Sequence, residues 1–98
     1  MSLLVEYSLK DGKADEQAEA LRTFVDGLKA MQDDGFHYSA FETDDPTRFI
    51  GLLEFDDEEA KQRFVASAPF AEYRDNASER FSASPNATQI RLVASTRK

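Results

Sequence analysis

The side chains that could take part in acid–base chemistry or bind a ligand's oxygen atoms are few in this sequence. His37 is the only histidine, and an imidazole, with an ordinary pKa of about 6.5, is the natural proton acceptor near neutral pH. Tyr73 and Tyr38 carry hydroxyl groups that could hydrogen-bond a carbonyl or hydroxyl group. We therefore predict His37 and Tyr73 as catalytic residues and Tyr38 as a substrate-binding residue. The alternatives are a surface or dimer-interface histidine beside a glycine turn, and core tyrosines with solvated tips.

Phenylalanine is the other residue type that could contact a ligand, and the chain contains eight. A phenyl ring can stack on a planar ligand, or it can simply fill the hydrophobic core. We predict as substrate-binding residues the aromatic side chains of Phe41, Phe55, Phe64, Phe70 and Phe81. For any one of them, a place in the core is the competing interpretation.

Composition argues against several functional classes. The chain has no cysteine, which excludes disulfides and thiolate chemistry. The acidic runs at 44–45 and 56–59 are better explained as a turn and a helix cap than as metal ligands, so we expect no metal site. A net charge of −7 argues against a nucleic-acid partner. The first ten residues resemble neither a signal peptide nor a membrane span, so we expect a cytoplasmic protein without membrane contacts.

The elements that must position these residues follow from periodicity and from turn and cap signals. Alternation and aromatic content predict strands at 3–9, 36–43, 48–55 and 88–95. An apolar stripe predicts a helix at 15–33, with Asp15 as N-cap and Gly35 as stop signal. A second helical region, starting with a capping box at Asp56, is expected in two pieces, 57–66 and 69–80, because Pro69 suits the first turn of a new helix.

This order predicts a single α+β domain over residues 1–98, with ferredoxin-like β-α-β-β-α-β topology. Four antiparallel strands would carry both helices on one face of the sheet. The strands are apolar on both sides: Phe49, Gly51, Leu53 and Phe55 share one face, and Ile50 with Leu52 share the other. A sheet with two apolar faces needs a second covering layer, so we expect a homodimer.

Several segments carry a resemblance to a known family. They are 35–41 (GFHYSAF), 45–49 (DPTRF), 54–55 (EF) and 64–70 (FVASAPF). A glycine at a strand entry, an acid–proline turn, an aromatic residue near the end of the third strand and a Ser-Pro break in an alanine-rich helix resemble the antibiotic-biosynthesis monooxygenase (ABM) family of dimeric α/β barrels. The match in layout covers nearly the whole chain.

The resemblance implies a hydrophobic cleft between sheet and helices, and oxygenation of a small aromatic or quinol-type substrate without metal, flavin or other cofactor. Some relatives instead bind and degrade haem. This chain has Phe55 where the family often has tryptophan, Phe64 where it often has histidine, and no histidine in the Ser-Pro break. These departures argue against haem degradation. They keep open the alternative of a non-catalytic dimeric module that binds an apolar ligand or stabilises an assembly.

Overall fold

The structure is a computed structural model that describes residues 1–97 of the 98-residue chain. Strands and helices follow one another along the chain in the predicted order, and the second helical region is divided into separate helices. The strands are β1 (Ser2–Ser8), β2 (Phe36–Glu42), β3 (Arg48–Phe55) and β4 (Asn86–Ile90). The helices are α1 (Ala14–Ala30), α2 (Glu58–Val65), α3 (Ala68–Asp75) and the short 3-10 helix η1 (Ala77–Glu79).

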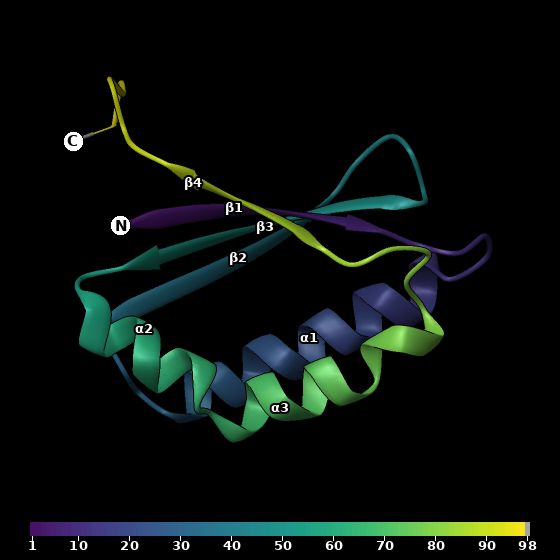
Figure 1. The fold of residues 1–98 in the computed structure, drawn as a ribbon, viewed down its shortest axis with the longest axis horizontal. Coiled ribbons are helices and arrows are strands. Elements are labelled where there is room, and N and C mark those ends of the chain that lie inside the picture. Colours follow the sequence, from purple (N-terminus) through teal and green to yellow (C-terminus); the bar gives the residue numbers. More distant parts are fainter. Residues whose placement is uncertain (98) are drawn as a thin grey trace.

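The strands form one four-stranded sheet in the order β2-β3-β1-β4, and every neighbouring pair is antiparallel. The helices lie together on one side of this sheet, while the opposite side has no covering element (Figure 1). This arrangement confirms the predicted ferredoxin-like α+β fold.

The hydrophobic core lies between the sheet and the helices. The β1–β3 register places Tyr7 opposite Phe49 and Val5 opposite Gly51. Side chains alternate across a strand, so these residues share the face that the helices cover. The four residues predicted to share one face of this strand, Phe49, Gly51, Leu53 and Phe55, are all buried, so theirs is the face that the helices cover. Helix α1 contributes Leu21, Phe24 and Leu28 to the same core.

The break between α2 and α3 falls where the proline predicted it. The Ser67 side chain is the N-cap of α3 and accepts a hydrogen bond from the Phe70 amide at 3.3 Å. Pro69 lies in the first turn, where its missing N–H costs nothing. Helix α3 then packs on α1 at Gly27, where a Cβ atom would be 2.9 Å from the Pro69 ring. The break therefore lets α3 turn and pack closely against α1.

The predicted helix starts are each displaced. Asp57, not Asp56, caps α2, and its carboxylate accepts a hydrogen bond from the Ala60 amide at 2.8 Å. Helix α1 begins one residue earlier than predicted, so Asp15 lies in its first turn and Lys13 occupies the N-cap position without a side-chain cap. An acidic residue in the first turn is favourable for the helix dipole in either case. Local sequence alone does not distinguish these neighbouring registers.

Three predicted element ends are also wrong. The second piece of the second helical region was expected to reach residue 80, but α3 ends at Asp75 and a separate 3-10 helix, η1, follows at Ala77–Glu79. Helix α1 ends at Ala30 because Gln32 adopts a left-handed conformation, with φ of 52°, so Gly35 is not its stop signal. The last strand spans Asn86–Ile90 instead of 88–95. Ile90 pairs with Ser2, the first residue of β1. The following segment departs from the sheet (Figure 1) and leaves Leu92 82% and Val93 97% exposed.

Candidate functional site

A cavity of about 360 Å³ lies between the inner face of the sheet and helices α2 and α3. Its size is within the range of small-molecule sites, which are typically apolar with a few convergent polar groups. Its lining is almost entirely aromatic and aliphatic and includes all three tyrosines of the chain, Tyr7, Tyr38 and Tyr73. Among residues 1–97, the charged residues in its lining are Lys61 and Arg74, and none of the lining residues there carries a carboxylate.

Most of the residues predicted from sequence to form a site meet at this cavity. They are Tyr38, Phe55, Phe64, Phe70, Tyr73 and Phe81. Phe64 is at the centre of this group, with ring centroids of Phe36, Phe55 and Phe70 5.2–5.7 Å away. Close contact among rings holds these side chains in place, so the cavity has rigid aromatic walls.

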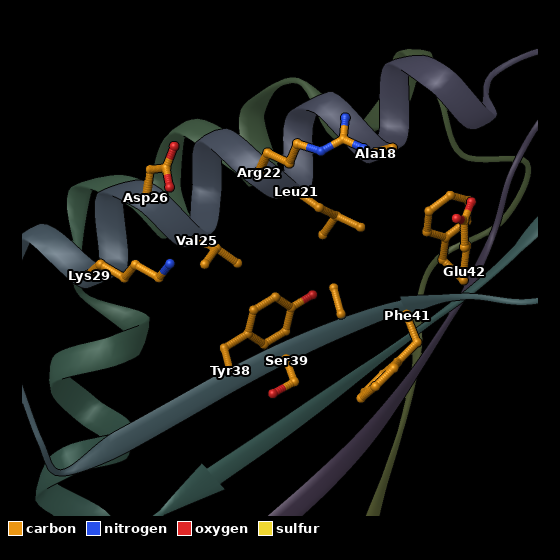
Figure 2. Close-up of a pocket in the computed structure, with 12 residues that line it drawn as sticks. Ala18, Leu21, Arg22, Val25, Asp26, Lys29, Tyr38, Ser39, Phe41 and Glu42 are labelled. Atoms are coloured by element: carbon orange, nitrogen blue, oxygen red, sulfur yellow. The ribbon is translucent and has the colours of Figure 1, made fainter.

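His37 and Phe41 lie elsewhere. Both alternate with Tyr38 along β2, so their side chains belong to the uncovered face of the sheet, and neither lines the cavity. His37 is opposite Glu54 in the β2–β3 register. Phe41 is 52% exposed, and it points away from α1 in Figure 2. The catalytic role predicted for His37 and the ligand contact predicted for Phe41 stay predictions, without a geometric link to the cavity.

The three tyrosines line the cavity mainly with their rings, and their hydroxyls are bonded within the protein. The hydroxyl oxygens of Tyr7 and Tyr38 are 2.8 Å apart and share a hydrogen bond. Burial raises the pKa of each well above the ordinary value for tyrosine, and the neighbouring phenols raise the pKa of Tyr7 further. Burial also raises the pKa of Tyr73, although the hydrogen bond from Gln17 acts in the opposite direction. All three tyrosines are therefore neutral near pH 7 and are not available as bases.

The pair of tyrosines requires a glycine beside it. A Cβ atom at Gly51 would lie 2.9 Å from the Tyr38 hydroxyl and 3.2 Å from the Tyr7 ring. We expect Gly51→Ala to displace both phenols and to lower the free energy of unfolding by about 1–3 kcal/mol, a typical cost of overpacking. Denaturant titration measures this change in the free energy of unfolding. In a Tyr38→Phe background, which lacks the closest atom, the same change should cost less. An equal cost in both backgrounds would contradict the proposed contact.

Behind Tyr73, two further buried polar residues continue the hydrogen-bonded chain. The Gln17 amide nitrogen donates to the Tyr73 hydroxyl at 2.7 Å, and the Gln17 amide oxygen accepts from Arg80 Nε at 2.8 Å. The Arg80 guanidinium also lies over the rings of Tyr73 and Phe81, 5.4 and 5.7 Å from their centroids. This cluster ties α1 to the segment that follows α3.

Tyr7, Gln17 and Arg80 were not predicted as site residues. Tyr7 could have been found, because it shares one face of its strand with Leu3, Val5 and Leu9. Gln17 is four residues before Leu21 on the buried face of α1, and a polar residue on an apolar helix face is a signal for a buried hydrogen bond. Nothing in the local sequence of Arg80 indicates burial. Its place depends on the path of the chain after α3.

A wider hollow of about 510 Å³ lies between α1 and β2. Figure 2 shows Arg22, Asp26 and Lys29 along its α1 side, with Tyr38 rising from β2 toward Val25. The Tyr38 side chain lines both this hollow and the aromatic cavity, and it therefore separates them. The charged rim and the shortage of aromatic side chains make this hollow a weaker candidate for an aromatic ligand.

Residues 1–97 contain neither a membrane-spanning helix nor a cluster of metal-binding side chains. No helix there has the length and apolar character needed to cross a bilayer. Across the same residues, histidine, aspartate and glutamate side chains do not gather in groups of three or more that could hold a metal ion.

Comparison with known proteins gives consistent results. A solved antibiotic biosynthesis monooxygenase superposes with a TM-score of 0.80 at 18% identity, covering 95% of this chain and 98% of that one. A Nitrosomonas europaea protein of unknown function gives 0.81 at 23% identity, covering 99% and 92%. A Pseudomonas aeruginosa protein gives 0.80 at 17% identity, covering 95% and 93%. These likenesses show the fold.

No curated protein sequence matches the chain significantly. The family model described as "Antibiotic biosynthesis monooxygenase" does match, over residues 1–76. That match spans β1 to the end of α3 and therefore includes most of the cavity walls. The chain belongs to the antibiotic biosynthesis monooxygenase family.

Proposed function

We propose that the cavity binds a small planar phenol or quinol and that the protein is a monooxygenase that oxidises this substrate with O₂. The observation that carries the proposal is the cavity of about 360 Å³, whose lining is almost entirely aromatic and aliphatic and includes all three tyrosines. Aromatic walls suit a flat ring, and neutral phenol donors suit its oxygen atoms. Family membership supports the reaction class.

The reaction balances without an external reductant. A quinol and O₂ give a hydroxyquinone and water: one oxygen atom forms the new C–O bond, and the other leaves as water with two hydrogen atoms of the substrate. The ionised quinol is the electron-rich form that can reduce O₂. The tyrosines remain protonated because burial raises their pKa values. Their contribution is therefore to hold and stabilise the ionised oxygen, while the dry aromatic walls exclude water.

The test is O₂ uptake with a panel of quinols and phenols, followed by mass spectrometry of products formed under ¹⁸O₂. We expect one O₂ consumed per substrate and one ¹⁸O atom in the product. Tyr73→Phe should lower kcat about tenfold or more, the usual range for loss of an oxyanion donor. Ligand binding without O₂ consumption would instead indicate a non-catalytic binding module, and absence of both would remove the proposal.

The same assay decides the prediction made for His37. His37→Ala removes the only imidazole of the chain. A loss of kcat with an altered pH profile would support His37 as the proton acceptor, reached by a route across the sheet. Unchanged kinetics would leave the bound quinol to release its proton to solvent, with rates that rise with pH as the quinolate forms.

We also propose that the uncovered face of the sheet pairs with a second copy of the chain. Leu4 and Leu52 are directly opposite each other on this face, with Ile50 and the exposed Phe41 beside them. Sedimentation at micromolar concentration should give a dimer of 11.0 kDa chains. Leu52→Glu should shift it to monomer, and Met31→Glu, at an exposed apolar site outside this face, should not. A monomeric wild-type protein would contradict the dimer.

A further inference from the structure

Residues 91–95, here called the tail, leave the sheet after β4 with their apolar side chains in solvent. Leu92 is 82% and Val93 97% exposed, the highest values among the large apolar side chains of residues 1–97. The tail rises from the side of the sheet that faces away from the helices (Figure 1). The second copy proposed above would lie on that side, so the tail is placed to reach it.

The outer edge of β2 is an open surface that suits an extended segment. In the sheet order, β2 comes first and pairs only with β3. One side of its seven-residue backbone therefore has no strand partner among residues 1–97. Such an edge is a template for another strand, because its unpaired N–H and C=O groups can bond a second backbone.

Beside this edge, an open space can accept the side chains of an added strand. The hollow of about 510 Å³ lies between α1 and β2, and Figure 2 shows it open between these two elements. A second hollow of about 330 Å³ lies along the same elements, and Val25 and Tyr38 line both. A strand added to β2 would direct every second side chain to the helix-covered side of the sheet, where this space lies.

Charge favours the tail of a second copy as the occupant of this edge. Glu42 is the last residue of β2, Asp44 follows it closely, and both are exposed. Arg91, the first residue of the tail, is also exposed. None of these three belongs to an ion pair recorded within residues 1–97. The other edge strand, β4, has no charged residue in Asn86–Ile90 and offers no such attraction.

We infer that the tail of each copy adds to the β2 edge of the other copy as a fifth, antiparallel strand. The register that joins the opposite charges gives three neighbouring pairs: Arg91 with Glu42, Leu92 with Phe41, and Val93 with Ala40. Residues directly opposite each other share a face. One exposed apolar side chain of the tail therefore joins the uncovered face of the sheet, and the other enters the hollow beside α1. The inference rests on the proposed dimer and not on the proposed reaction.

The test is disulfide formation between copies, which is simple to interpret because the chain has no cysteine of its own. Val93→Cys and Ala40→Cys are combined in one chain. The inferred register places these side chains opposite each other across two copies, within the reach of a disulfide. Mild oxidation should convert most of the protein into covalent dimers, at twice the mass of the 11.0 kDa chain on a non-reducing gel.

Val93→Cys combined with Ser39→Cys is the matched control. Ser39 is the neighbour of Ala40 on β2, and its side chain points to the other face of the strand. Oxidation of this variant should give covalent dimers much more slowly. Equal cross-linking at both positions would indicate a tail that collides with β2 without pairing to it, and would overturn the inferred strand.

Charge reversal tests the same contact without cysteines. Arg91→Glu and Glu42→Arg should each raise the dissociation constant of the dimer about threefold or more, because each places like charges opposite each other in both copies of the contact. The double variant should recover the wild-type affinity. Asp75→Arg makes the same change in net charge at the exposed end of α3 and should leave the affinity unchanged. Sedimentation measures all four variants.

The outcomes separate this inference from the proposals on which it depends. A monomeric wild-type protein would remove both the dimer and the exchanged tail. A dimer whose cysteines stay reduced, or join within one chain, would leave the pairing of sheets standing and overturn the tail contact. A double reversal that does not recover affinity would overturn the register. Oxygen uptake by the wild-type protein bears on the proposed reaction alone.

Discussion

Replacing Phe64 by alanine is expected to lower the free energy of unfolding by about 3–5 kcal/mol, the cost of deleting a buried phenyl ring. Phe64 is only 2% exposed. Its ring contacts aromatic rings from α1, from β2 and β3, and from α3. Phe24 and Phe70 cannot easily move inward, because Phe24 also contacts Tyr38 and Tyr73, and the two rings contact each other. The space left by the ring would therefore persist, and stability would fall by more than the transfer energy alone.

Denaturant unfolding followed by circular dichroism measures this effect. Val65→Ala is the matched control, since Val65 is the next residue on the same helix and is 48% exposed. It should cost less than about 1 kcal/mol. If Phe64→Ala were no more destabilising than Val65→Ala, the aromatic cluster would not be the core of this protein. An increased m-value would indicate a looser native or denatured state and would complicate the comparison.

Blocking the cavity with Ala87→Phe is expected to weaken binding of a phenolic ligand by more than about tenfold, with a comparable fall in kcat/KM. Ala87 is on β4, opposite Val5, and lines the cavity at its exposed side. A phenyl ring there would occupy space that the ligand needs. Because Ala87 is exposed and phenylalanine is favourable in strands, the stability of the fold should change little.

The control for this variant is Gln89→Phe. Gln89 is two residues further along β4 on the same side of the strand, and it does not line the cavity. Calorimetric titration with 4-nitrophenol should show weak binding for Ala87→Phe and wild-type affinity for Gln89→Phe. Equal affinity in both variants would place the ligand outside this cavity, and the hollow beside α1 would become the next candidate.

The sequence predicted much of the candidate site because the site coincides with the core. Aromatic residues at inward strand positions and on the buried faces of helices had to converge between sheet and helices, so Phe55, Phe64 and Tyr73 meet as expected. The residue type of His37 suggested a catalytic role, but it could not show which face of the sheet the side chain occupies. A shift of one residue along a strand moves a side chain to the other face, and His37 lies on the face opposite Tyr38.

Local patterns determined the order of elements, the inward face of each strand and the division of the second helical region at Pro69. These depend on short-range sterics, periodicity and capping, which neighbouring residues carry themselves. The tertiary structure alone decided where β4 ends, because that depends on how far β1 extends beside it. It also decided that Gln17 and Arg80, 63 residues apart in sequence, meet behind Tyr73. Long-range contacts of this kind come from the path of the whole chain, which no local pattern carries.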